Sequence, residues 1–347
     1  MKKILYVSNI EVPYRTEYFN QLSKKVDLTV LYERKKSSNR NEKWSTSIES
    51  NYSIEYLKGI KILNEYALDL KIIKYLFSKK YDEIIIGCYN SPSQIIGMLL
   101  MRIFKRKYIL NLDGDYYIEG TGIKKSIKRY LIKGATKYFV AGQEVKSKLI
   151  KYVNKDNIFC YHFSSMTNKE ITENSKHLNK NISNEILVVG QYFDYKGLDI
   201  ALEAAKINSK IKYKFVGSGN RSNLLLKKIN EMKLKNVKVI HFLQKKELFE
   251  EYQKCKCVLL SSNKECWGLV INEAASFGCP IISTNGSGAA NEFLDSNWIV
   301  PVGDYRKMYS KILELDNKEY DVNHLIEKSK KYTIEQTVIE TSKMLEE

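Results

Sequence analysis

The sequence is poor in the residues that mark several classes of protein. It has 6 cysteines and 4 prolines in 347 residues, and its longest apolar run, Ile95–Met101, ends at Arg102. So few cysteines do not suggest a disulfide framework in a chain of this length, and the run falls far short of the ~20 residues that span a bilayer. Residues 1–9 start with basic residues but lack the apolar core of a signal peptide. We therefore expect a folded protein with reduced, mostly buried thiols that stays in the cytoplasm.

Charge is distributed unevenly along the chain. Residues 1–170 hold 31 Lys and Arg against 17 Asp and Glu, whereas residues 171–347 hold 26 against 23. A basic first half suggests that one domain meets an anionic surface or substrate. A lysine-rich proteome would raise the Lys content, but it would not confine the excess to one half. Nucleic acid is a poor candidate partner, because no recognised nucleic-acid module is present.

The order of apolar segments predicts an α/β protein with two domains. Short apolar runs alternate with helix-period segments, such as the strand 4–8 and a helix over 66–78, and this alternation is typical of parallel sheets. The polar segment 166–185 interrupts the pattern, which restarts with the strand 186–190. We predict an amino-terminal Rossmann-like domain over 1–165, a linker over 166–185 and a carboxyl-terminal Rossmann-like domain over 186–331.

The densest set of candidate binding residues follows a predicted strand at 258–262. Glu265 lies at the carboxyl end of that strand, where ligands of such sheets bind. Gly268 permits close approach of the backbone, and the amides of Leu269 and Val270 are unpaired donors at a helix start, which suit a phosphate. Glu273, about a turn into the helix, is placed to accept hydrogen bonds from sugar hydroxyls.

This segment resembles the signature of family 4 retaining glycosyltransferases. That signature is Glu-x7-Glu followed by Glu-Ala-x-x-x-Gly-x-Pro, and Ala274, Gly278 and Pro280 fit it together with the two glutamates. The resemblance implies the GT-B fold, in which two Rossmann-like domains face each other across a cleft and a final helix, here 332–347, crosses back to the amino-terminal domain. It also implies that Glu265 contacts the donor sugar and that Glu273 contacts the nucleotide ribose.

A second match to the family lies upstream of the signature. The family usually shows Gly-Arg, a short loop and then Lys-Gly at a helix start, and Lys196-Gly197 fits this pattern. The resemblance implies that Lys196 stabilises the diphosphate leaving group, a role that needs positive charge. Gln191 stands where the Arg is usual and carries no charge. The expected donor site comprises Gln191, Lys196, Gly217, Glu265, Trp267, Gly268, Leu269, Val270 and Glu273.

The acceptor site is expected in the amino-terminal half. The loop after the first strand contains Pro13-Tyr14-Arg15, and Arg15 either faces a ligand or is solvated. Asp113, at the end of another strand, is the candidate polar catalytic group of this domain. Asp113-Gly114-Asp115 also mimics the metal-binding Asp-x-Asp of GT-A enzymes. We reject that interpretation because the carboxyl-terminal half fits GT-B, and we expect no cofactor and no essential metal.

A basic segment in the first half is a candidate membrane-surface patch. Ile123, Ile127, Tyr130 and Leu131 share one face of a predicted helix, and lysines and Arg129 cover much of the rest. An enzyme that extends a lipid-linked sugar would need such a patch for peripheral contact with an anionic membrane. The alternative is a helix packed on the core with a solvated basic face.

The activity implied by the resemblance is transfer of a hexose-type sugar with retention of anomeric configuration. The donor would be a nucleotide diphosphate sugar, with a UDP-sugar in first place. The acceptor would be a glycan or lipid-linked sugar of capsule or lipopolysaccharide synthesis. Two alternatives stay open: Gln191 permits an inactive nucleotide-sugar-binding partner subunit, and the fold permits a nucleotide-sugar 2-epimerase.

Overall fold

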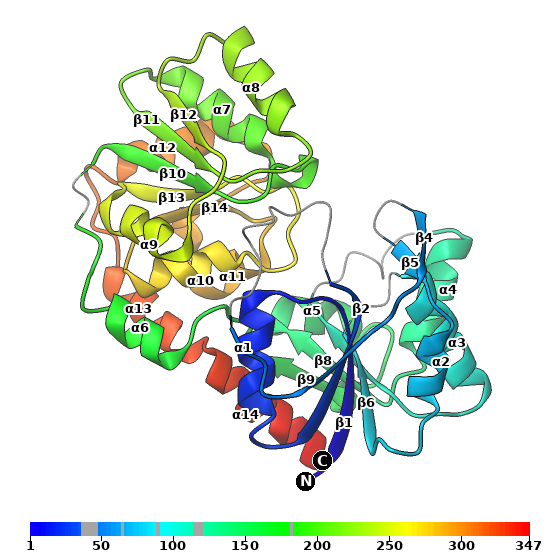
Figure 1. The fold of residues 1–347 in the computed structure, drawn as a ribbon. Coiled ribbons are helices and arrows are strands. Elements are labelled where there is room, and N and C mark those ends of the chain that lie inside the picture. The colour runs from blue at the N-terminus through cyan, green and yellow to red at the C-terminus, as the bar shows by residue number, and fades with distance from the viewer. Residues whose placement is uncertain (36–47, 64–65, 88–90, 114–120, 181–182) are drawn as a thin grey trace. The chain divides into compact units, whose positions relative to one another are not determined.

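The computed structural model describes residues 1–35, 48–63, 66–87, 91–113, 121–180 and 183–347. The chain divides into two compact units (Figure 1). The amino-terminal unit comprises Met1–Phe163 and Ile334–Glu347, and the carboxyl-terminal unit comprises Ser164–Thr333. Both are α/β units built on a parallel sheet, as the alternation in the sequence predicts.

The amino-terminal unit contains a seven-stranded parallel sheet in the order β3-β2-β1-β6-β7-β8-β9. Its central strands are buried on both faces, which is why they read as continuous apolar runs. A separate antiparallel pair joins β4 and β5. The strands are β1 (Lys3–Ile10), β2 (Asp27–Arg34), β3 (Ser53–Tyr56), β4 (Ile60–Leu63), β5 (Tyr66–Leu68), β6 (Glu83–Ile86), β7 (Ile109–Leu112), β8 (Lys137–Ala141) and β9 (Ile158–Tyr161).

Two of the four prolines start helices in this unit. Pro13 and Pro92 occupy first-turn positions, where the missing amide hydrogen costs nothing. The Ser91 hydroxyl accepts a hydrogen bond from Gln94 N at 3.2 Å and caps the second of these helices. The helices are α1 (Pro13–Leu22), α2 (Lys71–Leu76), α3 (Pro92–Ile103), α4 (Ile123–Ile132), α5 (Gly142–Leu149) and α14 (Ile334–Glu346).

The helix predicted over 66–78 is wrong in its first part. Residues 66–68 form strand β5, and helix α2 starts only at Lys71. Asp69 ends the strand, because its carboxylate accepts hydrogen bonds from Lys58 N at 2.8 Å and Lys71 N at 2.9 Å. An Asp that binds nearby backbone amides in this way favours a turn over a continuous helix.

The carboxyl-terminal unit has a six-stranded parallel sheet in the order β12-β11-β10-β13-β14-β15. Helices α7, α8 and α12 cover one face, and α9, α10, α11 and α13 cover the other (Figure 1). The strands are β10 (Glu185–Val189), β11 (Lys212–Val216), β12 (Val237–Ile240), β13 (Cys257–Leu260), β14 (Ile281–Thr284) and β15 (Ile299–Val300). The helices are α6 (Asn168–Asn174), α7 (Leu198–Ile207), α8 (Ser222–Glu231), α9 (Lys245–Lys254), α10 (Leu269–Ser276), α11 (Gly288–Phe293), α12 (Tyr305–Glu314) and α13 (Val322–Lys331).

The segment predicted as a linker contains helix α6. Thr167 and Glu170 form a reciprocal capping box, in which each side chain accepts a hydrogen bond from the other residue's backbone amide. Ile171 is buried, and Asn174 donates to Ser276 Oγ at 2.8 Å. This part of the segment 166–185 therefore packs within the carboxyl-terminal unit, and its polar composition reflects capping. Residues 181–182 lie outside the described residues.

Helix α14 returns to the amino-terminal unit, to which residues 334–347 belong. It packs against α1, and the hydroxyls of Tyr18 and Thr341 lie 2.9 Å apart in a hydrogen bond. Thr337 also donates to His162 O at 2.6 Å. These contacts hold the last helix of the chain on the amino-terminal unit.

The cysteines of the described residues are free thiols. Three of them are buried and two are half-buried, whereas Cys88 lies outside the described residues. Cys255 Sγ and Cys279 Sγ lie 3.4 Å apart in a hydrogen bond and do not form a disulfide. Within the described ranges, no helix is both long and apolar enough to cross a membrane.

Candidate active site

The strand order of the carboxyl-terminal unit reverses between β10 and β13. Chain connections leave these two central strands in opposite directions at such a point, so a crevice at their carboxyl ends can receive a ligand. Lys196 follows β10, and Glu265 follows β13. The two expected reaction-site residues of this unit therefore come from opposite sides of the reversal.

Gly197 fixes the turn that presents Lys196. Residues 194–196 form a short 3-10 turn, and Gly197 adopts φ 58° and ψ 32°, a left-handed conformation that favours glycine. A Cβ at this position would lie 2.1 Å from Ser261 O, at the end of β13. Ser261 Oγ in turn donates to Lys196 O at 3.1 Å. The turn after β10 is thus held against the neighbouring strand.

Lys196 and Glu265 form an ion pair. The Lys196 ammonium donates to Oε1 of Glu265, and Ser262 Oγ donates to Oε2 at 2.8 Å. The side chains are only 11% and 15% exposed, so their interaction is stronger than that of a surface pair. The Glu265 amide donates to Gly286 O at 2.7 Å, which anchors the backbone to the loop after β14. A phosphate that binds here could accept the hydrogen bond of the Lys196 ammonium in place of Glu265. Ser262 would still hold the Glu265 carboxylate.

Gly217 and Gln191 lie beside this pair at the ends of β11 and β10. Gly217 has φ 150°, and a Cβ there would lie 1.8 Å from Gly190 O, so only glycine fits. The side chain of Gln191 is half-buried and makes no hydrogen bond to the described residues. The backbones at the ends of β10 and β11 therefore lie close together. Gln191 presents an amide donor and no charge at this edge of the sheet.

The expected phosphate-binding amides stand at the start of α10. Gly268 precedes the helix, and Leu269 and Val270 are its first residues, where backbone amides lack partners within the helix. Trp267 behaves differently from its neighbours. It is 2% exposed, its indole donates to Asn272 at 2.8 Å, and its ring packs against Tyr332. The structure places Trp267 in the core of the unit, where it supports the helix start.

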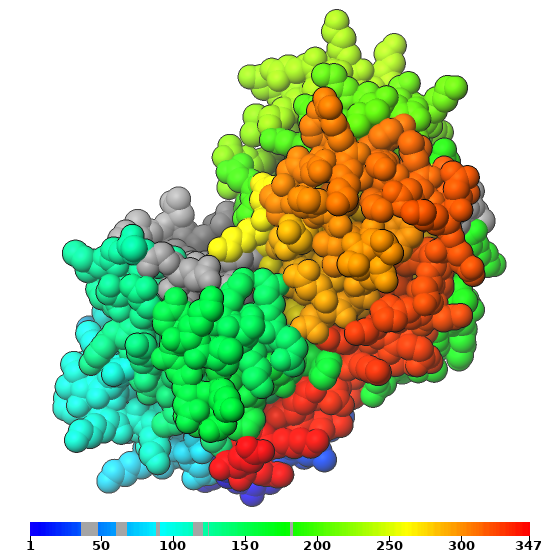
Figure 2. Space-filling model, turned by 180° about the vertical axis from the view of Figure 1, so that it is seen from behind, coloured from blue at the N-terminus to red at the C-terminus, as the bar shows by residue number. Residues whose placement is uncertain are grey.

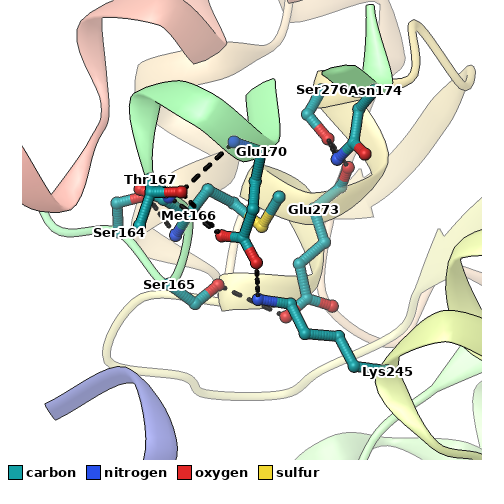
Figure 3. A network of polar contacts seen from close by, with 9 residues as sticks. All are labelled: Ser164, Ser165, Met166, Thr167, Glu170, Asn174, Lys245, Glu273 and Ser276. Atoms are coloured by element: carbon teal, nitrogen blue, oxygen red, sulfur yellow. Dashed lines mark hydrogen bonds and ion pairs between the residues drawn. The ribbon is translucent and has the colours of Figure 1, made fainter. Parts of the chain in front are cut away.

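Glu273 belongs to a second polar network, shown in Figure 3. Tyr252 OH donates to its Oε2 at 2.9 Å, and Ser165 Oγ donates to its Oε1 at 3.3 Å. Burial raises the pKa of Glu273, although Lys245 nearby lowers it. Lys245 forms an ion pair with Glu170. Both carboxylate oxygens of Glu273 therefore have hydroxyl donors, which is the kind of partner that a ribose would supply.

The amino-terminal unit has its own reversal of strand order, between β1 and β6. Arg15, in α1 after β1, forms an ion pair with Asp113, which follows β7. Burial lowers the pKa of Arg15, but Asp113 together with the nearby tyrosines raises it by more, and the net shift is upward. Arg15 is 9% exposed, so the solvated alternative for this residue is wrong. Its guanidinium satisfies a carboxylate that the sequence places 98 residues away.

Three further side chains complete this cluster. Tyr161 donates to Asp113, and Asn111 donates to Tyr161 OH at 3.2 Å and to Phe139 O at 3.0 Å. Tyr6 donates to Asn111. Tyr14 stands at the edge of the cluster, with its ring centroid 5.8 Å from that of Phe163. The expected acceptor residues Tyr14, Arg15 and Asp113 thus lie together at the carboxyl ends of the strands.

The chain is similar to known proteins in both sequence and fold. Residues 169–332 match the family model for glycosyl transferases group 1. An uncharacterized glycosyltransferase of Methanocaldococcus jannaschii is 28% identical over 311 residues, which cover 85% of this chain and 84% of the relative. An uncharacterized protein of the Klebsiella pneumoniae cps region is 26% identical, over 71% of this chain and 75% of the relative. The Anabaena protein HepE, solved with UDP, superposes with TM-score 0.74 at 14% identity and full coverage of both chains.

The carboxyl-terminal unit is similar to the group 1 glycosyl transferases. The family match covers the residues that carry Lys196, Glu265 and Glu273. The fold is GT-B, in agreement with the expectation from sequence, and each of its two α/β units has a parallel sheet.

Possible metal-ligating side chains are scattered in the described part of the chain. No cluster of three or more His, Cys, Asp or Glu side chains there could hold a metal ion. Of the Asp-x-Asp mimic, Gly114 and Asp115 lie outside the described residues, and Asp113 is engaged by Arg15 and Tyr161. The GT-A interpretation therefore gains no support from the one acid that can be placed.

Several polar partners of the site residues escape sequence reasoning. Ser262 orients Glu265, Tyr252 and Ser165 hold Glu273, and Tyr161 holds Asp113. Ser262 carries a weak signal, because it directly follows a strand and precedes Glu265. The other three come from distant segments, and no spacing in the sequence marks them.

Proposed function

We propose that this protein is a retaining glycosyltransferase that transfers a hexose-type sugar from a UDP-sugar to a glycan or lipid-linked acceptor of a surface polysaccharide. The ion pair of Lys196 and Glu265 at the strand-order reversal carries the proposal. A sugar diphosphate has phosphates that the Lys196 ammonium could bind and hydroxyls that could donate hydrogen bonds to the Glu265 carboxylate. The match of residues 169–332 to the group 1 family model and the UDP bound to HepE support this donor class.

In this proposal Lys196 stabilises the diphosphate as it leaves. Negative charge grows on the leaving phosphate, and a fixed ammonium in a partly buried site stabilises that charge more than water does. The first amides of α10 add donors without adding charge. Glu265 accepts hydrogen bonds from sugar hydroxyls and so orients the anomeric carbon. The acceptor hydroxyl attacks on the face that the diphosphate leaves and gives its proton to the leaving phosphate, so the configuration is retained.

The acceptor is proposed to contact the cluster of Tyr14, Arg15 and Asp113. Arg15 and Tyr161 hold the Asp113 carboxylate in one orientation, from which it can accept a hydrogen bond from a sugar hydroxyl. A surface polysaccharide as product is supported by the cps-region relative. No cofactor or metal is part of this reaction.

A transfer assay tests the proposal. The purified protein is incubated with UDP-glucose, UDP-galactose or UDP-N-acetylglucosamine and a lipid-linked or free glycan acceptor, and UDP release and product are measured. We expect UDP release that depends on the acceptor, a product whose NMR coupling shows the donor's anomeric configuration, and full activity in EDTA. Inverted configuration would refute the retaining mechanism, and strict dependence on a divalent cation would favour the Asp-x-Asp interpretation.

A second candidate function rests on Gln191. Without the usual Arg the site contains one lysine, and that lysine is paired with Glu265. A nucleotide-sugar-binding partner subunit without activity of its own would show UDP-sugar binding by calorimetry and no turnover with any donor and acceptor. A 2-epimerase would convert the UDP-sugar without an acceptor, and the same assay detects that conversion.

A further inference from the structure

An apolar stripe is exposed on helices α3 and α4 of the amino-terminal unit. On α4, Ile123 is 81% exposed, and Ile127 and Tyr130 are 46% and 48% exposed. Their spacing of four and three residues puts them on one face of the helix. At the end of α3, Ile103 and Phe104 are 58% and 67% exposed.

The stripe is separate from the face by which α4 packs on the unit. Leu131 and Ile132 are each 1% exposed and belong to the main core of the unit. Ile123, Ile127 and Tyr130 do not share that burial, so the expectation that Leu131 lies with them on one exposed face is wrong. The end of the helix packs on the core through Leu131 and Ile132. The apolar face formed by Ile123, Ile127 and Tyr130 is not covered by the described residues.

The two helices are neighbours, and the end of α3 meets α4. They contact each other and lie side by side at the edge of the unit (Figure 1), and their residues form a joined cyan-to-teal area in the space-filling view (Figure 2). Arg102, near the end of α3, stacks over the Tyr130 ring at 3.9 Å and donates to Tyr130 O. This contact fixes the end of α3 against the stripe on α4.

The border of this surface is strongly basic. The segments 99–107 and 121–133 contain nine Lys and Arg and no Asp or Glu. Lys105, Lys107 and Lys133 are exposed. Long basic side chains can lie along apolar surface while their charges reach an anionic layer.

We propose that the α3–α4 surface, defined by Leu99, Ile103, Phe104, Ile123, Ile127 and Tyr130, docks on an anionic phospholipid bilayer. The apolar side chains enter the boundary between headgroups and acyl chains, and the surrounding cations face the lipid phosphates. A helix with one apolar face and a lysine-rich border is the pattern of interfacial binding. Each cation near an anionic leaflet adds to the attraction.

A protein or nucleic acid partner fits this surface less well. Lysine is depleted at protein interfaces, whereas it dominates the border here. Single-stranded nucleic acid binds through aromatic rings on which bases stack, and four of the six side chains of the surface are aliphatic. The observations therefore favour lipid, and the inference does not depend on the transfer reaction.

Vesicle binding of the full chain tests the proposal. The protein is mixed with phosphatidylcholine vesicles, either alone or with about one third phosphatidylglycerol, and bound protein is measured by flotation. We expect binding to the anionic vesicles only, and weaker binding at about 0.5 M salt, where screening is strong. The double variant Ile123→Ser/Ile127→Ser should bind at least about tenfold more weakly, because it removes two large apolar side chains from the contact.

Ile339→Ser is the matched control. Ile339 is also in the amino-terminal unit and is 47% exposed, but it lies on α14, which packs on α1 and β9. This variant should bind vesicles like the wild type, and thermal melts of all variants verify that they fold. No binding to anionic vesicles at low salt overturns the proposal, as does equal binding by the double variant. A third outcome is that the wild type does not bind vesicles, forms a dimer in sedimentation velocity, and the double variant is a monomer. That result would identify the surface as a contact between two copies and overturn the proposal. Transfer to a water-soluble acceptor stays measurable in every case, so failure of this proposal is distinct from failure of the proposed activity.

Discussion

Lys196 and Glu265 are 69 residues apart in the sequence and form an ion pair at the carboxyl edge of one sheet. Each neutralises the other in the ligand-free protein. In the proposed reaction, the donor diphosphate would therefore meet a site with no net charge from this pair and would compete with Glu265 for the ammonium. The consequences for turnover, donor affinity and stability can be measured.

Removal of the ammonium should slow the reaction more than it weakens binding. We expect Lys196→Ala to lower kcat by roughly 100-fold, as loss of one donor to a developing anion does, with a smaller change in donor KM. Steady-state kinetics measures both. Lys214→Ala is the control, because Lys214 makes a similarly buried contact with Glu185 and Glu251 in the same unit. A Lys196→Ala variant with wild-type kcat would exclude Lys196 from the mechanism.

A cation at position 191 should improve the phosphate site. Gln191→Arg adds a charge beside a pair that is already neutral, so we expect tighter UDP binding by about 1 kcal/mol or more, and faster turnover. Isothermal titration calorimetry with UDP and the transfer assay measure the two effects. Gln191→Lys tests whether charge alone suffices. No gain with either variant would mean that the site does not need the Arg that the resembling family usually has there.

Loss of the Glu273 carboxylate should weaken nucleotide binding. We expect Glu273→Ala to raise the UDP dissociation constant about tenfold or more, the size of a lost hydrogen bond to a charged group. A ribose hydroxyl would replace the longer of its two present contacts, which is that with Ser165. Ser165→Ala should therefore bind UDP as well as the wild type does. Unchanged affinity in Glu273→Ala, measured by calorimetry, contradicts the ribose role.

Disruption of the Arg15–Asp113 pair should destabilise the amino-terminal unit. Arg15→Ala leaves Asp113 as an unpaired and partly buried charge, and such changes cost roughly 3–5 kcal/mol. Urea unfolding measures the loss. Arg221→Ala breaks an exposed pair with Asp194 and should cost less than about 1 kcal/mol. If both variants lose equally little free energy of unfolding, the tyrosines and Asn111 hold the cluster together instead of the ion pair.

Glu33 should make stability depend on pH. It is 7% exposed at the end of β2, and burial raises its pKa to about 7, whereas an exposed Glu titrates near ~4.3. Between these values the folded protein binds a proton that the unfolded chain has lost, so the free energy of unfolding falls as the pH rises from about 5 to about 8. Glu33→Gln cannot ionise and should flatten this decline by up to roughly 3 kcal/mol. Urea unfolding at both pH values measures it, and Glu55→Gln, at an exposed site, should follow the wild type.

The sequence by itself determined the α/β class, the family signature and the order of the elements. These features are local: strand and helix periods, glycine at tight turns, and proline at helix starts are set by neighbours in the chain. The positions of Lys196 and Glu265 at strand ends belong to the same class, because each directly follows a recognisable apolar run.

Only the tertiary structure decided how distant side chains pair. The contacts of Arg15 with Asp113, and of Glu273 with Tyr252 and Ser165, join segments that no spacing connects, because strand order decides which ends meet. The same holds for burial. Trp267 and Leu131 are in the core, whereas Ile123 and Ile127 are exposed. A helical period shows which residues share a face, but only packing decides whether that face is covered.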